Sequence, residues 1–455
     1  MDASIEKIAQ YASGLRYEDL PEDVVHACKR HFVDTLGCGL GALKTEPSVI
    51  ARRTAERAAA MEGAASILGS DKSSIPELAA FANGVMMRYL DANDTYPAGG
   101  GHPSDCLAAL LAVAEARQAD GKAVILAMAI AYEIHHNLYK VTPGSSVRDK
   151  GWDHVLFIAI SSAAGCASLL KLDKEKTAHA LSLALTPNMP LEATRRGHLS
   201  MWKGCAAGNA ARNGVFAALL AADGMTGPDQ PIEGPHGLWE IIGEFQLNPM
   251  ARQPQKFGIL EACLKGFASE YHSQAPITVA LALSKKVAAA DIAAIDIDSY
   301  KFAISEIASE REKWHPTTRE TADHSMPYIV AAVLLDGAFS EEIFSDERLK
   351  DSKIHELADK VSVTENPEFT RQIPHLIPCR IVIRTNDGKS IEAAVNHPKG
   401  HFKNPMSDQE VEVKFSAHAK RALAQDKIAP LLARLWNFDR ENDIRGLFQM
   451  LNGRH

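Results

Sequence analysis

The stretch Asp91–Asp105 holds the densest group of residues that could do chemistry. It reads Asp-Ala-Asn-Asp-Thr-Tyr-Pro-Ala-Gly-Gly-Gly-His-Pro-Ser-Asp, so Asp91, Asp94 and Thr95 precede a glycine run that ends at His102. Glycine has no Cβ, which lets the backbone adopt positive φ or approach a ligand closely. An apolar helix capped by Ser104 is expected to follow, and a helix N-terminus favours a bound anion. We predict the floor of an active site for a carboxylate substrate; an ordinary glycine-rich connection with a surface histidine is the alternative.

A second histidine and a lysine stand in similar places. His154 follows Arg-Asp-Lys-Gly-Trp-Asp and immediately precedes a predicted apolar helix over residues 155–170. Two histidines delivered to helix N-termini by separate loops favour a shared anion pocket. Farther on, Arg196 and Lys203 precede a run of very small residues that ends at Arg212, which predicts a helix packed closely on its neighbours with Lys203 at its beginning. A solvated basic turn explains the cations equally well.

The second half of the chain adds two groups of polar residues. Lys265 precedes a Glu-Tyr-His-Ser-Gln run that contains His272 and Gln274. Arg319 opens the block Arg-Glu-Thr-Ala-Asp-His-Ser-Met-Pro-Tyr, and Tyr328 ends it at the beginning of a predicted helix. A proline just before Tyr328 fixes its approach to that helix. A capping segment with a half-buried tyrosine is the alternative to a functional role.

Composition excludes several classes of protein. The 455 residues are 46% hydrophobic and 23% charged, as in an ordinary globular protein with two domains. A formal charge of −8 without any lysine and arginine block argues against a nucleic-acid or anionic-membrane surface. We find no uninterrupted apolar stretch of about 18 residues and no export-signal pattern at the N-terminus, so we expect a cytoplasmic protein.

Cysteine and glycine spacing give no cofactor motif. The seven cysteines are scattered and form no C-x-x-C pair, which predicts reduced thiols and neither a zinc nor an iron–sulfur site. The glycines of Gly37–Gly41 continue a helical pattern and do not follow a strand, so they predict close helix packing and not a dinucleotide site. No metal or cofactor is therefore predicted.

Hydrophobic periodicity predicts a mainly α fold. Residues 5–220 are rich in alanine and leucine with helical spacing, and the tail 407–451 is helical again. Between them, alternation over residues 292–304 predicts a strand, and residues 379–395 predict a hairpin that turns at Asn386–Gly388. We predict a large all-helical domain formed by residues 1–264 and 405–455, and a smaller α+β lid domain formed by residues 265–404. Two crossings between domains imply a hinge and a cleft.

The residue inventory suits proton transfer on a polyanion. Lysines and helix N-termini can bind carboxylates and stabilise the enediolate-like charge that forms when a C–H beside a carboxylate loses its proton. A histidine or lysine can move the proton, and a second acid is needed to expel a hydroxyl group. Spacing alone does not choose among elimination, decarboxylation and epimerisation.

At these residues the sequence resembles the MmgE/PrpD family over nearly the whole chain. Each block already described occurs in family order, and so do Lys203-Gly-Cys-Ala with Asn-Ala-Ala-Arg-Asn-Gly, and His397-Pro-Lys-Gly-His. The resemblance is to citrate and 2-methylcitrate dehydratases of that family. It implies a helical domain with an α+β lid, a homodimer, and metal-free removal of water from 2-methylcitrate, and from citrate as well, giving 2-methyl-cis-aconitate from the former.

The resemblance also implies which residues form the site. The positions that match the family pocket, all expected to be catalytic except the substrate-binding Thr95, are Asp91, Thr95, His102, His154, Lys203, Lys265 and Tyr328. In our hypothesis Lys203 and Lys265 bind carboxylates, while His102 with either Tyr328 or His154 handles the protons. The further residues expected to bind substrate are Asp94, Arg196, His272, Gln274 and Arg319.

Two other functions stay open at this point. One is an iminodisuccinate epimerase or cis-aconitate decarboxylase of the same family, which shares most of the pocket. The other is a non-catalytic helical scaffold whose charged loops bind partners. The polar His and Lys loops favour an enzyme over the scaffold.

Overall fold

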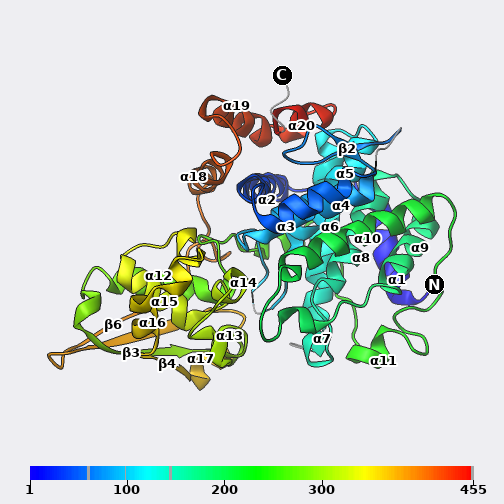
Figure 1. Ribbon diagram of the computed structural model, residues 1–455. Coiled ribbons are helices and arrows are strands. Elements are labelled where there is room, and N and C mark those ends of the chain that lie inside the picture. Colours follow the sequence, from blue (N-terminus) through cyan, green and yellow to red (C-terminus); the bar gives the residue numbers. More distant parts are fainter. Residues whose placement is uncertain (59–61, 98, 143–145, 452–455) are drawn as a thin grey trace. The chain divides into compact units, whose positions relative to one another are not determined.

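The computed structural model describes residues 1–58, 62–97, 99–142 and 146–451, and the chain divides into two compact units (Figure 1). Unit 1 comprises Met1–Thr194, Gly204–Ala262 and Ser407–His455, and unit 2 comprises Arg195–Lys203 and Cys263–Met406. Unit 1 is almost entirely helical and unit 2 combines helices with a sheet, which confirms the predicted mainly α fold class. The segment Arg195–Lys203, which we assigned to the helical domain, belongs to unit 2.

Unit 1 is built from helices around a core of apolar ones. Every residue of α5 from Leu107 to Glu115 is buried, and so is nearly all of α8, because both helices are apolar on almost every side. The helices are α1 (Ala3–Gly14), α2 (Glu22–Gly41), α3 (Glu46–Ala55), α4 (Pro76–Tyr89), α5 (Leu107–Ala116), α6 (Gly121–Val141), α7 (Ser146–Asp149), α8 (Leu156–Leu169), α9 (Lys174–Leu185), α10 (Trp202–Ala222), α11 (Leu238–Ile242), α18 (Asp408–Ala419), α19 (Gln425–Trp436) and α20 (Arg445–Leu451). A short antiparallel pair, β1 (Ala65–Ser66) and β2 (Ser73–Ser74), accompanies them.

The C-terminal tail returns to unit 1, as its helical pattern predicts. A Cβ atom on Gly37 of α2 would lie 3.1 Å from the Cα atom of Phe415 in α18. The buried ammonium of Lys414 also pairs with the Asp34 carboxylate at 2.6 Å. The glycines of residues 37–41 therefore serve close helix packing, as predicted.

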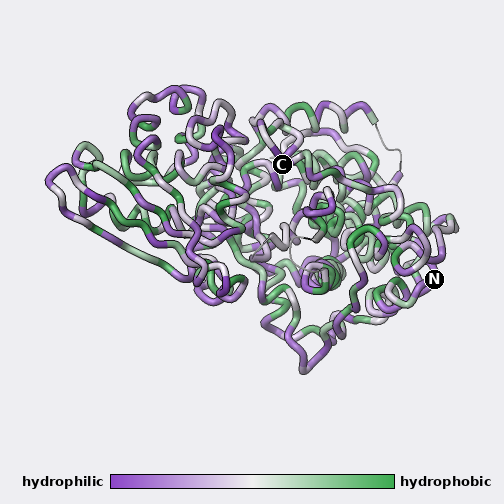
Figure 2. The backbone as a smooth tube through the Cα atoms, turned by 90° about the horizontal axis from the view of Figure 1, so that it is seen from below, coloured by the Kyte–Doolittle hydropathy of each residue, from purple (hydrophilic) through white to green (hydrophobic). Residues whose placement is uncertain are grey.

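The sheet of unit 2 has four strands in the order β4-β3-β5-β6. Its bounds are β3 (Ile292–Ser299), β4 (Val361–Glu365), β5 (Cys379–Thr385) and β6 (Ser390–Val395), with β4 parallel to β3 and the other pairs antiparallel. The β5–β6 hairpin is confirmed, and Gly388 in its turn has a φ of +80°. In Figure 2 the tube of this unit changes repeatedly between hydrophilic and hydrophobic along its strands, in agreement with the alternating burial of β5.

Helices cover this sheet. Helix α12 contacts β5 and β6, and α15 contacts β4. The helices of unit 2 are α12 (Gln274–Leu283), α13 (Lys301–Ile307), α14 (Arg319–Ala322), α15 (Met326–Asp336), α16 (Ser352–Ala358) and α17 (Pro367–Gln372).

Two sequence expectations differ from this unit. The strand predicted over residues 292–304 ends at Ser299, because Tyr300 begins the helix α13 and the following apolar residues also suit a helix face. Strand β4 was not predicted, because it is five residues long and largely exposed beyond Val361. Among the described residues, no helix combines the length and hydropathy needed to cross a bilayer.

The small residues at the start of α10 let it lie against α4. A Cβ atom on Gly208 would lie 2.7 Å from the carbonyl oxygen of Phe81, and one on Gly84 would lie 2.7 Å from the Cα atom of Gly208. Both neighbours are backbone atoms, which cannot move aside without shifting a helix. The predicted close packing of this helix is confirmed.

We predict that Gly208→Ala lowers the free energy of unfolding by about 1–3 kcal/mol, because an added methyl group overpacks this helix contact. The measurement is urea denaturation followed by circular dichroism. Gly14→Ala is the matched control, since its Cβ atom would meet only the flexible Arg252 guanidinium at 3.4 Å. A Gly208→Ala protein as stable as the control would contradict the packing argument.

Candidate active site

The loop between α4 and α5 contains an aspartate, Asp91, with a strained backbone conformation. Asp91 has a φ of +53°, a left-handed conformation that residues other than glycine seldom adopt. It is buried, and its Oδ1 atom lies 2.8 Å from Nη1 of the equally buried Arg88. Strained residues of this kind persist where the surrounding structure fixes them, and they cluster at functional sites. The ion pair with Arg88 is one contact that fixes Asp91.

The hydrogen bonds of His102 fix its tautomer. Nδ1 lies 2.6 Å from the carbonyl oxygen of Asp94, and a carbonyl can only accept, so Nδ1 carries the proton. Nε2 lies 2.9 Å from Nη2 of Arg88, which can only donate. The Nε2 lone pair therefore faces a guanidinium, and the imidazole is neutral. A neutral imidazole with its lone pair at Nε2 has the form that a general base needs.

His154 lies beside His102. The two ring centroids are 5.6 Å apart in an edge-on arrangement, and both side chains are buried. Nδ1 of His154 lies 2.8 Å from a carboxylate oxygen of Asp153, just before α8 begins at Leu156. A Cβ atom on Gly101 would lie 2.6 Å from the His154 ring, so the glycine run makes room for this imidazole. The structure thus brings the two histidine loops of unit 1 together.

Asp94 holds the loop from inside the protein. Its Oδ2 atom accepts a hydrogen bond from the Tyr132 hydroxyl at 2.7 Å and lies 2.7 Å from Nδ1 of His31, while Oδ1 accepts from the Ser104 amide at 3.0 Å. Burial alone would raise the pKa of this carboxyl, but the His31 contact and the two hydrogen bonds outweigh it and lower the pKa. Asp94 is therefore a buried anion whose backbone carbonyl positions His102.

Other polar residues also fasten the glycine run. The Thr95 hydroxyl lies 3.0 Å from the carbonyl oxygens of Tyr96 and Gly101, and it can donate to one of them at a time. The helix expected to begin at Ser104 starts at Leu107, after a 3-10 turn over Pro103–Cys106. Ser104 caps no helix, because its hydroxyl instead accepts a hydrogen bond from Asn93.

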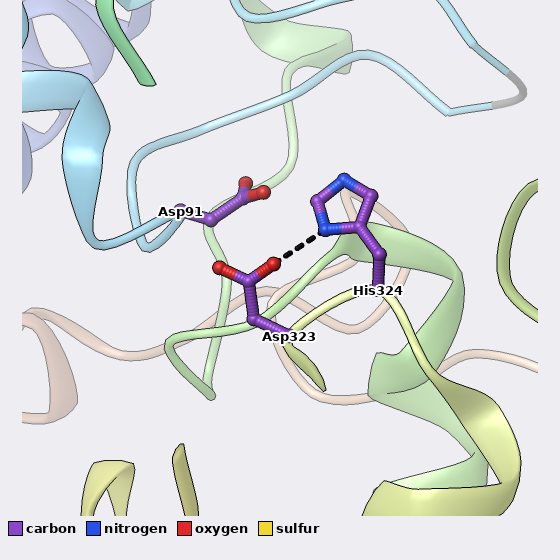
Figure 3. A group of neighbouring side chains, drawn as sticks. All are labelled: Asp91, Asp323 and His324. Atoms are coloured by element: carbon purple, nitrogen blue, oxygen red, sulfur yellow. Dashed lines mark hydrogen bonds and ion pairs between the residues drawn. The ribbon is translucent and has the colours of Figure 1, made fainter. Parts of the chain in front are cut away.

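In unit 2 the ammonium of Lys203 meets a buried carboxylate. Its Nζ atom lies 3.1 Å from both carboxylate oxygens of Asp323, and Nη1 of Arg319 lies 3.6 Å from the same group. Figure 3 shows the His324 imidazole directed at Asp323, with its Nδ1 atom 2.5 Å from Oδ1. Burial acts to raise the pKa of Asp323, but Lys203, His324 and Arg319 together lower it. The structure therefore joins two predicted cations through one carboxylate.

The segment around Lys265 is held by Gln274. The Gln274 amide accepts a hydrogen bond from the Phe267 amide at 3.0 Å and donates to its carbonyl at 3.1 Å. Lys265 is fully buried. Nδ1 of His272 forms a hydrogen bond with the Tyr300 hydroxyl, and Nε2 lies 3.8 Å from a Glu270 carboxylate oxygen. Gln274 and His272 thus have structural partners within unit 2.

Tyr328 and Arg196 have contrasting surroundings. Tyr328 is fully buried, its hydroxyl donates to the Ile343 carbonyl at 2.6 Å, and burial raises its pKa. Arg196 is 48% exposed, with its Nη1 atom 3.9 Å from Glu306. The predicted site residues divide between the two units. Unit 1 contains Asp91, Asp94, Thr95, His102 and His154, and unit 2 contains Arg196, Lys203, Lys265, His272, Gln274, Arg319 and Tyr328.

Sequence reasoning missed several residues of these networks. Arg88 contacts both Asp91 and His102 of the loop. The one feature of the sequence that could have indicated it is a lone arginine at the end of the apolar helix α4. Asp323 stood inside a block already quoted, but nothing in its spacing pointed to Lys203. His31 and Tyr132, which contact Asp94 from distant parts of the chain, stand in no sequence pattern that points to this loop.

His135 supports the glycine run from α6. Its Nε2 atom donates to the Gly100 carbonyl at 2.7 Å. The pKa of His135 is lowered to about 4, mainly by burial. It is therefore neutral in the folded protein, while in the unfolded chain a histidine titrates near 6.5. Between these two pH values the unfolded state binds more protons than the folded state. The contribution of the neutral His135 to the free energy of unfolding is therefore complete above about pH 6.5 and is lost as the pH drops towards 4.

We predict that His135 lowers the free energy of unfolding by at most about 3 kcal/mol as the pH falls from about 6.5 to about 4. The variant His135→Gln, which keeps a donor for Gly100, should make this pH dependence shallower. Urea denaturation at pH values from 4 to 8 measures it. Replacement of the exposed His198 by glutamine should leave the wild-type slope unchanged. A His135→Gln slope equal to that of the wild type would show that His135 does not control acid stability.

Comparison with known proteins places this chain in a family. The model of the MmgE/PrpD N-terminal domain matches residues 6–247, and that of the MmgE/PrpD C-terminal domain matches residues 267–437. The chain is 30% identical to 2-methylcitrate dehydratase of Escherichia coli K12, over 88% of this chain and 86% of the relative.

Two further relatives span most of the chain. The mitochondrial 2-methylcitrate dehydratase of Yarrowia lipolytica is 28% identical, over 95% of this chain and 86% of its own length. The human cis-aconitate decarboxylase is 26% identical, over 98% of this chain and 94% of its own length. With both family domains matched in order along the same chain, the protein belongs to the MmgE/PrpD family.

Proposed function

We propose that this protein is a hydro-lyase that removes water from 2-methylcitrate to give 2-methyl-cis-aconitate, and that it also acts on citrate. The observation that carries the proposal is the buried pair His102 and His154, one of them with its tautomer fixed beside Arg88. Similarity to 2-methylcitrate dehydratases over most of the chain supports the same reaction.

The reaction needs one base, one acid and cationic groups. The base takes a proton from the carbon beside a carboxylate, and the electrons of that C–H bond form the new double bond as the C–O bond breaks. The departing hydroxyl takes a proton from the acid and leaves as water, so atoms and charge balance. Cations stabilise the enediolate-like charge during the proton transfer. In the proposal Lys203 and Lys265 bind the substrate carboxylates.

We assign the two proton transfers to His102 and His154. Their rings are neighbours within one unit, and general acid–base catalysis needs both groups within reach of adjacent substrate atoms. Tyr328 is the other partner considered for His102, but its hydroxyl already donates to Ile343. A buried hydroxyl engaged in this way supports the protein core, so we favour His154.

Two alternatives differ in what the second proton does. A decarboxylase loses carbon dioxide and places a proton on carbon, and similarity to the human cis-aconitate decarboxylase supports it. An epimerase returns the proton to the opposite face of the same carbon, as an iminodisuccinate epimerase would. The homodimer and the cytoplasmic location expected from the sequence are part of the proposal.

We predict that purified protein dehydrates 2-methylcitrate, seen as rising ultraviolet absorbance of the unsaturated product, with slower turnover of citrate. The same assay with cis-aconitate and iminodisuccinate, followed by carbon dioxide release and by chirality, separates the alternatives. Activity should survive EDTA, because protein cations supply the charge stabilisation. Carbon dioxide release from cis-aconitate without dehydration would favour the decarboxylase, and no turnover of any substrate would favour a scaffold.

We predict that His102→Gln lowers kcat about 10²- to 10⁴-fold, the range for loss of a general acid or base. His154→Gln should give a similar loss, and both variants should keep the wild-type circular dichroism spectrum. Tyr328→Phe is the contrasting variant: it should lower stability by about 1 kcal/mol through the lost hydrogen bond while kcat stays within a few-fold. Near-normal kcat in His102→Gln would remove His102 from the chemistry, and a large loss in Tyr328→Phe would make the tyrosine its partner.

A further inference from the structure

Unit 2 contains a buried histidine whose hydrogen bonding is incomplete. His401 is 1% exposed, and its Nδ1 atom accepts a hydrogen bond from the Lys403 amide at 3.1 Å. Because Nδ1 is the acceptor, the proton of the neutral ring is on Nε2. In the part of the chain that the structure describes, Nε2 of His401 has no hydrogen-bond partner.

Such a donor is costly for the free protein. More than nine in ten buried polar groups have a partner, and a missing one destabilises the folded state. The ring packs on Phe402 and His397, with centroids 4.4 and 4.7 Å away. Phenylalanine would keep these ring contacts without an unsatisfied N–H group, and would lose only the Nδ1 hydrogen bond to the Lys403 amide. The imidazole therefore points to a use for its N–H group outside packing.

The charge state of the ring favours a donor role. The pKa of His401 is lowered to about 4, mainly by burial and in smaller part by the nearby His397 and Lys403. The ring is therefore neutral at pH 7 and offers one N–H donor, with the Lys403 ammonium near enough to affect its charge. An anionic acceptor, such as a carboxylate oxygen, matches both properties.

The turn that carries His401 is fixed and lies against the Lys265 segment. The Gly400 amide donates to Asn404 at 2.9 Å and the Asn404 amide donates back to His401 at 2.7 Å. Gly400 has a φ of +93°, and a Cβ atom there would lie 1.9 Å from the carbonyl oxygen of Leu264. Only glycine permits this approach, which fastens the turn to the residue before Lys265.

We infer that His401 is a further substrate-binding residue, whose Nε2–H group donates to a carboxylate of the same di- or tricarboxylate that Lys265 binds. The inference rests on the proposed function, and it adds a neutral donor to the cations assigned there. A neutral donor gives direction to a carboxylate without the competing salt pairs that a lysine would form.

The test is His401→Phe, with citrate and 2-methylcitrate as probes in calorimetric titration and in the dehydration assay. We expect the free variant to melt near the wild-type temperature, because removal of the unsatisfied Nε2–H donor offsets the lost hydrogen bond between Nδ1 and the Lys403 amide. Citrate should bind about 10- to 100-fold more weakly, the effect of losing a hydrogen bond to a charged group. KM should rise with it, while kcat stays within a few-fold because no proton transfer is lost.

Two companion variants keep the test decisive. His401→Gln places an amide donor near the position of Nε2, so it should recover most of the affinity even if His401→Phe folds poorly. His375→Gln, an exposed histidine of the same unit, should change neither affinity nor melting temperature.

The outcomes separate the two proposals. Wild-type citrate affinity in His401→Phe, or a lowered melting temperature with unchanged affinity, would make His401 a packing residue and overturn the inference while the proposed function stands. Wild-type protein that neither binds nor dehydrates citrate or 2-methylcitrate would overturn the proposed function, and the inference with it.

Discussion

The candidate site depends on one buried carboxylate, that of Asp94. An ionised group inside a protein is tolerated only when close polar contacts replace the lost water. Tyr132, His31 and the Ser104 amide supply those contacts, each from a different part of unit 1. The backbone carbonyl of the same residue fixes the tautomer of His102, the ring to which we assign a proton transfer. The loop, the helices that contact Asp94 and the His102 ring are thus joined by one set of hydrogen bonds.

The same constraint shapes the rest of the interior. Lys414 lies beside Asp34 and also donates to the Ala92 carbonyl, so a second buried charge supports the loop from the C-terminal tail. In unit 2, Asp323 takes the corresponding position between Lys203 and Arg319. Removing one member of such a pair leaves an uncompensated buried charge, which costs about 3–5 kcal/mol. These pairs therefore restrict which substitutions the fold tolerates, whatever their role in binding.

The sequence predicts the elements far better than their partners. Helical spacing, the hairpin turn and the small residues of α10 are local signals, and the structure has all three. Strand β4 is too short and too exposed for alternation to reveal it. Arg88, His31 and Asp323 were missed for a different reason: their importance comes from partners that only the fold brings near. A carboxylate beside a lysine far along the chain leaves no trace in local periodicity.

The relatives named as dehydratase and decarboxylase share a chemical problem, since both must stabilise negative charge on carbon beside a carboxylate. Cations that hold carboxylates serve every such reaction, so they cannot decide which one occurs. What differs is where the second proton is delivered: to a departing hydroxyl or to carbon. In the proposal, specificity comes from neutral groups whose tautomers are fixed by hydrogen bonds to the backbone. The Asp94 carbonyl holds the proton of His102 on Nδ1 and leaves an acceptor at Nε2, whereas the Lys403 amide occupies Nδ1 of His401 and leaves a donor at Nε2. Backbone groups that carry no charge of their own thus decide which of the two rings can take a proton from a bound acid and which can donate a hydrogen bond to it.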